Sequence, residues 1–180
     1  SPIFDYNGIV KYRTTRVEGR NLRMETAAIA FLKQNNISYS TMEYPENGPI
    51  AAKDVAAYFH FGDETDRLFK TLVTSDRKGG YYVFCLPAEK KLDLKRAASL
   101  VGVKNLQMVE PDIFQSLTGY THGGCSPFGM KTQLPTIVER SALNWETIYL
   151  SGGKIGLLLE VSPNALLHTL GATFESIAKA

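Results

Sequence analysis

The amino-acid sequence predicts an α+β domain with a mixed or antiparallel sheet. Apolar, β-rich runs outnumber the helical patterns, and several of these runs are joined by short glycine turns. The 180 residues, 44% of them hydrophobic, are enough to bury one sizeable core and too few to suggest two. Because repeats and low-complexity segments are absent from the sequence, a single globular domain is expected.

Helices are predicted where apolar spacing meets capping or breaking residues. Asn35 ends the first of them, Asp93 caps the third, and Ser162-Pro163 opens the last. The five predicted segments cover residues 25–35, 51–61, 92–102, 111–117 and 162–171.

Strands are predicted for the remaining apolar runs. The Asp76–Gly80 turn makes a hairpin of its two flanking runs, and Gly152-Gly153 makes a second tight turn. The predicted strands cover residues 37–44, 68–74, 81–86, 105–109, 136–139, 147–151 and 155–161, with an edge strand over 174–177.

The formal charge of +2 is unevenly distributed along the chain. Residues 1–23 carry five basic groups against Asp5 and Glu18, so the rest of the chain is close to neutral. A near-neutral domain argues against broad, salt-sensitive binding of nucleic-acid phosphates. If RNA is the partner, we expect the protein to grip only its end.

Residues 1–23 read as an upstream extension or an expression-vector remnant with the composition of a disordered tail, and residues 24–180 as the functional domain. The tail lacks the apolar centre of a secretory signal, and no segment has the ~20 apolar residues of a membrane helix. Cys85 and Cys125 form neither a disulfide framework nor a zinc pattern. We therefore expect a soluble cytoplasmic protein with no membrane partner, cofactor or metal.

Three short motifs carry the candidate chemistry. Lys70 lies in an apolar strand, where an ammonium needs a partner, so it could anchor a phosphate or an ester oxygen. The loop Gly123–Gly129 could present main-chain N–H groups to a developing oxyanion, and Ser151–Lys154 could bind a phosphate in the same way.

Each motif also has a purely structural interpretation. Lys70 could be solvated on an open sheet face, the Gly123–Gly129 loop could be a surface turn, and Ser151–Lys154 could be only a hairpin turn. His122 and Cys125 suggest a nucleophile with a base, but no acid lies nearby to orient them. The densest basic cluster, formed by Lys90, Lys91, Lys95 and Arg96, is either a solvated helix face or a surface that could guide RNA by neutralising two or three of its phosphates.

The segments Phe69-Lys70-Thr71-Leu72, Gly123–Pro127 and Ser151–Lys154 resemble the YbaK family of aminoacyl-tRNA deacylases over roughly residues 24–180. This family is related to the editing domain inserted in bacterial prolyl-tRNA synthetases. The resemblance implies a strongly curved, barrel-like mixed sheet with helices outside. The chain departs from the family at residues 49–53, where Ile50, Ala51 and Ala52 replace an aromatic.

The resemblance implies a trans-editing hydrolase that deacylates Cys-tRNA(Pro) by a substrate-assisted mechanism. It assigns catalysis to Lys70, Gly123 and Gly124, and substrate binding to Tyr44, Cys125, Ser126, Pro127, Ser151, Gly152 and Gly153. The expected partners are the 3′ end of aminoacyl-tRNA and prolyl-tRNA synthetase. The alternatives are an Ala-tRNA(Pro) deacylase, a non-catalytic tRNA- or nucleotide-binding partner of a synthetase, and a cysteine-dependent hydrolase of other small esters.

Overall fold

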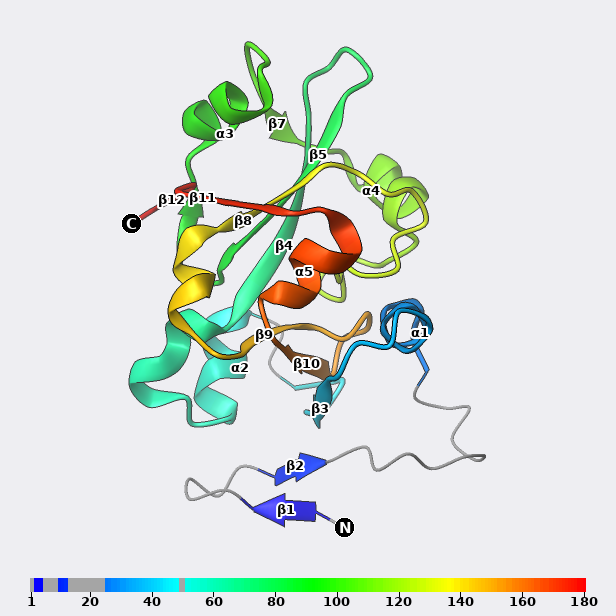
Figure 1. Ribbon diagram of the computed structural model, residues 1–180, viewed down its shortest axis with the longest axis vertical. Helices are drawn as coiled ribbons and strands as arrows, with labels where there is room; N and C mark the ends of the chain where they lie inside the picture. Colours follow the sequence, from blue (N-terminus) through cyan, green and yellow to red (C-terminus); the bar gives the residue numbers. More distant parts are fainter. Residues whose placement is uncertain (1, 5–9, 13–24, 49–50) are drawn as a thin grey trace.

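The computed structural model describes residues 2–4, 10–12, 25–48 and 51–180 (Figure 1). Its first five-stranded sheet is antiparallel throughout. The strand order is β1 (Pro2–Phe4), β2 (Val10–Tyr12), β3 (Ser40–Glu43), β10 (Leu157–Val161) and β9 (Ile148–Ser151). The first two strands fall in the segment predicted to be a tail, the rest of which lies outside the described residues.

The second five-stranded sheet is mixed, because β8 pairs in parallel with both of its neighbours. Its order is β11 (Thr173–Glu175), β8 (Thr136–Glu139), β5 (Tyr81–Pro87), β4 (Phe69–Ser75) and β7 (Gln107–Met108). A two-stranded sheet pairs β6 (Lys91–Leu92) with β12 (Ala178–Lys179). The predicted mixed α+β class is confirmed.

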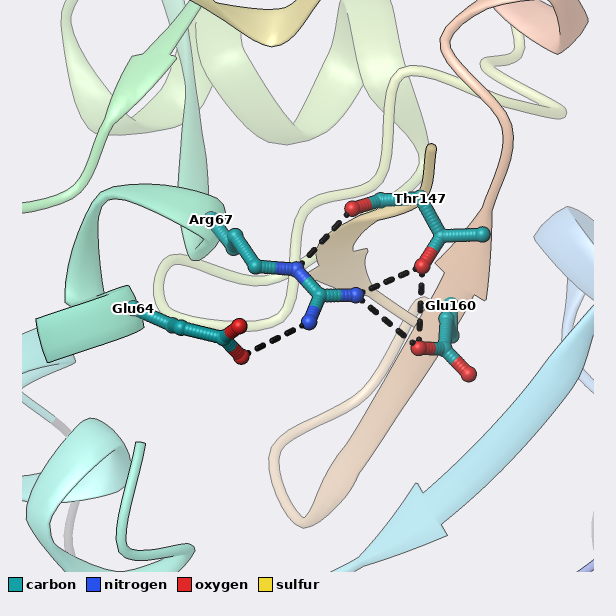
Figure 2. Close-up of polar contacts among 4 residues, drawn as sticks. All are labelled: Glu64, Arg67, Thr147 and Glu160. Carbon is teal, nitrogen blue, oxygen red and sulfur yellow. Dashed lines mark hydrogen bonds and ion pairs between the residues drawn. The ribbon is translucent and has the colours of Figure 1, made fainter. Parts of the chain in front are cut away.

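The described part of the chain contains no closed sheet, so the barrel-like curvature is not confirmed. The two large sheets meet instead at one parallel bridge between Leu68 and Tyr149. Beside this bridge, Arg67 donates to the Thr147 carbonyl (3.1 Å), the Thr147 hydroxyl (2.6 Å) and Glu160 (3.2 Å) (Figure 2). The same guanidinium bonds Glu64 at 2.8 Å and lies 4.8 Å from the centre of the Tyr149 ring. These contacts link the segment just before β4 to the residue before β9 and to β10.

Four of the helices are shorter at both ends than the predicted segments, whereas α4 extends one residue beyond its predicted end, and the two 3₁₀ turns were not predicted. Thr26 caps α1 by accepting from the Ile29 N–H, and Asp93 caps α3 by accepting from the Arg96 N–H. Gly102 ends α3 with a φ of 74°, which glycine adopts without strain. The helices are α1 (Ala27–Gln34), α2 (Ala52–Tyr58), α3 (Leu94–Val101), α4 (Pro111–Thr118) and α5 (Asn164–Leu170), with 3₁₀ turns η1 (Gly62–Arg67) and η2 (Arg140–Asn144).

The core lies on both faces of the second sheet. Successive residues of β5 alternate, so that Val83 and Cys85 pack into the larger cluster with α1, β9 and β10. Phe84 and Leu86 face the opposite way and pack against α3. Strand β4, which carries Lys70, pairs with β5 along its whole length and with β7 at Thr74 and Ser75.

Candidate active site

A cavity of about 690 Å³ opens beside β4. Its walls come from residues 68–73, several residues between 108 and 115, residues 120–123 and 125, and the single residues Tyr44, Val55, Ala88, Ser151 and Leu158. The predicted site residues that line it are Tyr44, Lys70, Gly123, Cys125 and Ser151. The structure thus brings the three sequence motifs together around one space.

Lys70 is half-buried in this wall, opposite Leu86 of β5. Its ammonium donates a hydrogen bond of 2.5 Å to the main-chain oxygen of Lys90. Burial lowers the pKa of Lys70 from its ordinary value. Since an ammonium has three N–H donors, two remain for a ligand.

The charge in the cavity is concentrated at one point. Of the described residues that line the cavity, Lys70 is the only one with a carboxylate, ammonium or guanidinium group. A site of this kind attracts an anionic or strongly polar oxygen and supplies no carboxylate as a general base.

Residues Thr121–Gly124 form a turn at the cavity wall. The Gly124 N–H donates to the Thr121 carbonyl at 3.1 Å, and Gly123 has a φ of 87°, as at the third position of a type II turn. The Gly123 N–H makes no hydrogen bond within the described part of the chain. The two glycines therefore differ, because the Gly123 amide is available to a ligand whereas the Gly124 amide closes the turn.

Gly124 shapes the site through close packing. It is buried, and a Cβ at this position would come within 2.9 Å of the Lys154 Cα and 3.0 Å of the Ile155 nitrogen. The Gly123–Gly129 loop and the turn after β9 thus approach each other main chain to main chain, which only glycine permits. Gly124 itself does not line the cavity.

Ser126 and Pro127 are buried away from the cavity. The Ser126 hydroxyl accepts from the Phe128 N–H at 3.3 Å, while Pro127 borders a separate cavity of about 40 Å³. Both residues support the loop, and their predicted contact with substrate stays a prediction.

Cys125 reaches the cavity but is a poor nucleophile. Its side chain is 8% exposed, and burial raises the pKa of its thiol well above the ordinary value. Cys85, behind β4, is fully buried, and its pKa is raised to about 12. Both thiols are therefore protonated at neutral pH.

The turn Ser151–Gly153 is held from the side of α1. The Thr26 hydroxyl donates to the Gly152 carbonyl at 2.5 Å, and the Ser151 hydroxyl accepts from the Gly153 N–H at 3.2 Å. With its oxygen accepting from that amide, Ser151 keeps its own proton for a ligand in the cavity. Gly152 and Gly153 position Ser151 and do not line the cavity.

Aromatic side chains complete the walls. Tyr44 packs edge-on against Phe59, with centroids 6.0 Å apart, and the buried Tyr120 donates to the Phe128 carbonyl at 2.5 Å. His122 is exposed at the wall, its ring 5.9 Å from that of Phe114. Sequence reasoning did not single out Phe114 or Tyr120, because core and pocket aromatics follow the same pattern in a sequence.

The described residues contain no group of three or more His, Cys, Asp or Glu side chains placed to hold a metal ion. Among them, too, no helix has the length and apolar character needed to cross a bilayer.

Comparison with known proteins identifies the family of this chain. The sequence profile of the aminoacyl-tRNA editing domain matches residues 50–169. The chain is 35% identical over 159 residues to EbsC of Enterococcus faecalis (strain ATCC 700802 / V583), a protein named for Cys-tRNA(Pro)/Cys-tRNA(Cys) deacylase activity. The match covers 88% of this chain and 96% of EbsC.

Solved structures share the fold. A crystal structure described as a trans-editing enzyme for prolyl-tRNA synthetase has a TM-score of 0.74 and 25% identity, covering 86% of this chain and 96% of that chain. The structure of APE2540 has a TM-score of 0.77 at 24% identity, covering 86% of this chain and all of that one, and shows likeness of fold alone.

The sequence match and the fold together define an enzyme class, the aminoacyl-tRNA deacylases, which hydrolyse the ester between an amino acid and tRNA. The chain belongs to the aminoacyl-tRNA editing domain family.

Proposed function

We propose that the protein is a trans-editing hydrolase that removes cysteine from mischarged Cys-tRNA(Pro). The observation that carries the proposal is the cavity whose described lining residues include Lys70 as the one ammonium and no carboxylate or guanidinium, and where the Gly123 amide makes no hydrogen bond within the described part of the chain. The activity named for EbsC and the description of the prolyl-tRNA synthetase trans-editing structure support this substrate.

In the proposed mechanism, Lys70 anchors the terminal adenosine or the ester oxygen. The Gly123 N–H stabilises the oxyanion that forms when the carbonyl is attacked, an effect typically worth about 3 kcal/mol per donor. Water adds to the carbonyl, the bond to the ribose oxygen breaks, and that oxygen takes the proton while the free amino acid leaves. Assistance comes from the substrate, since the described lining residues include no carboxylate. Either a free ribose hydroxyl works with the water, or the cysteine thiol attacks first, displaces the ribose oxygen, which takes the thiol proton, and forms a cyclic thioester that water then opens.

A second hydrolytic site is needed because a synthetase pocket discriminates poorly between amino acids of similar size. One methylene is worth only about 1–3 kcal/mol, so cysteine and alanine can both reach proline tRNA. The predominantly apolar cavity, bordered by Phe69, Val73 and Phe114, suits a thiol-bearing side chain better than a charged one. Residues 24–180 form this editing domain, which acts in the cytoplasm beside prolyl-tRNA synthetase.

The test is a panel of tRNAs charged with cysteine, alanine or proline and incubated with the wild-type protein. Preferential release of cysteine from Cys-tRNA(Pro) is expected. Release of alanine alone would instead identify an Ala-tRNA(Pro) deacylase. Retention of charged tRNA on a filter with no release would identify a non-catalytic binder.

A further inference from the structure

The C-terminal strand brings a lysine beside the basic cluster that the sequence shows. In the β6–β12 ladder, Lys179 lies directly opposite Lys91. Both are exposed, while Leu92, the next residue of β6, is buried. Directly opposite residues of an antiparallel pair project on the same face, so the two ammonium groups are neighbours.

Two further cations adjoin this pair. Helix α3 begins just after β6, and its first turn carries the exposed Lys95 and Arg96. The Arg96 Nε donates to the Ser176 carbonyl at 3.4 Å, which holds the guanidinium beside the chain leading into β12. We call Lys91, Lys95, Arg96 and Lys179 the basic strip.

The positive charge of the basic strip is not balanced locally. None of its four residues forms a salt bridge with another described residue. The nearest acidic side chains in sequence are Glu89 and Asp93, and for Lys179 Glu175. Asp93 accepts the Arg96 N–H as the cap of α3. Like charges directly opposite in a ladder cost stability, and a bound polyanion would offset that cost.

The basic strip continues into the active site through Lys90. The Lys90 carbonyl accepts the hydrogen bond from Lys70, and Ala88 of the same turn lines the cavity. Lys91 follows directly. A chain whose end is bound at Lys70 would therefore have its next charged groups beside Lys91 and Lys179.

We propose that the basic strip binds successive phosphates of the RNA strand whose 3′ end enters the cavity. The inference rests on the proposed function and adds how the tRNA body is held. The occupant is RNA because the partner must carry regularly spaced negative charges and end in the cavity. The rest of residues 24–180, with 11 basic against 16 acidic groups, does not attract phosphates broadly.

The test compares two triple variants with the same change in net charge. The strip variant is Lys91→Gln with Lys95→Gln and Lys179→Gln. The control variant is Arg77→Gln with Lys78→Gln and Lys104→Gln, whose positions lie in the β4–β5 turn and the α3–β7 connection, drawn at the top of Figure 1. Binding of uncharged proline tRNA is measured between about 50 and 200 mM KCl, the range over which phosphate contacts are weakened.

For the strip variant, the slope of log Kd against log salt concentration should be smaller by about 2 to 3, roughly one for each lost phosphate contact. The control variant should keep the wild-type slope. Equal slopes for wild type and strip variant would overturn the inference, as would an equal reduction in the control.

A short substrate separates this inference from the proposed function. Cysteinyl-adenosine ester carries no phosphate backbone, so the strip variant should hydrolyse it at the wild-type rate while its KM for Cys-tRNA(Pro) rises at least about 10-fold. If the wild type hydrolyses neither substrate, the proposed function fails, and the salt slopes still decide the role of the basic strip. A slower reaction of the strip variant on the short ester would overturn the inference, because it would place these residues in the cavity chemistry.

Discussion

Lys70 donates a 2.5 Å hydrogen bond to the main-chain oxygen of Lys90, in the turn that follows its partner strand β5. A carbonyl fixes the ammonium without neutralising it, so Lys70, a residue of the cavity wall, keeps its positive charge at a defined position. The hairpin β4–β5 thereby sets both the location and the direction of the group on which the proposed chemistry depends.

Replacing Lys70 should abolish activity and leave the fold intact. For Lys70→Ala we expect kcat/KM on Cys-tRNA(Pro) to fall at least about 100-fold, because the one formal charge of the described cavity wall is removed. The circular dichroism spectrum and Tm should stay close to wild type, since the side chain is only half-buried. Lys78→Ala, in the β4–β5 turn, is the matched control and should retain full activity. Turnover of Lys70→Ala within about threefold of wild type would refute the assignment.

The activity should fall as the pH becomes alkaline, and the fall should begin at a lower pH than the deprotonation of an ordinary lysine would cause. Burial lowers the pKa of Lys70, so its ammonium loses a proton below the usual value near 10.5. A pH profile of kcat/KM, corrected for spontaneous ester hydrolysis, should show this alkaline limb. In Lys70→Arg the limb should disappear, because arginine stays charged, although the rate will be lower.

The same shift has a defined effect on stability. The unfolded chain binds this proton more tightly than the native protein does, so the contribution of Lys70 to the free energy of unfolding increases as pH rises between the native and the unfolded pKa. Urea unfolding of the wild type and Lys70→Met across that pH range checks whether the difference in their free energies of unfolding increases with pH. A wild type that loses stability relative to Lys70→Met as the pH rises would contradict it.

Neither thiol should act as a nucleophile. Cys125→Ala should keep kcat within a few-fold of wild type, because burial holds the thiol protonated and the proposed attack does not use it. Iodoacetamide should modify Cys125 and Cys85 much more slowly than a free cysteine, as followed by mass spectrometry. Rapid alkylation of Cys125 with parallel loss of activity would instead support a cysteine-dependent hydrolase.

Adding a methyl group at Gly124 should disturb the site indirectly, through the packing of its loop against Lys154 and Ile155. The Cβ of Gly124→Ala would meet the main chain of Lys154 and Ile155 at 2.9–3.0 Å, so one of the two loops must move. We expect a loss of about 1–3 kcal/mol in unfolding free energy and a clear fall in kcat/KM. Gly62→Ala is the control, since no atom lies within 4 Å of its Cβ and only its φ of 57° opposes the change. If Gly62→Ala lowered kcat/KM and Gly124→Ala did not, the close packing at Gly124 would not matter for activity.

Arg67 should stabilise the junction of the two sheets. The side chains of Arg67 and Glu160 are 15% and 11% exposed, so Arg67→Met would deprive a mostly buried carboxylate of its ion pair with Arg67. The expected loss is about 3 kcal/mol in urea unfolding. Glu64→Gln removes the more exposed contact of the same guanidinium and should cost less than about 1 kcal/mol. Equal losses for the two variants would contradict the expectation that the less exposed contacts of Arg67 contribute more stability than its contact with Glu64.

The site was only partly readable in the sequence. Lys70 was identifiable because a lysine within an apolar strand requires an explanation, and the structure places it in the cavity wall. No sequence feature separates Gly123, which lines the cavity, from Gly124, which packs against Lys154. Both residues suit a tight turn equally well, and only the loop packed behind them distinguishes their roles.

The sequence by itself determined the local structure of this protein. Helix caps such as Asp93, stops such as Gly102 and the Asp76–Gly80 hairpin depend on neighbours a few residues away, so their chemistry specifies them directly. The tertiary structure decided which distant segments meet. The pairing of Lys179 with Lys91 and the bond from Thr26 to Gly152 join residues far apart in the chain. Such contacts arise from the way the sheets pair and pack, and an alternation of apolar residues does not encode which strand will be the partner.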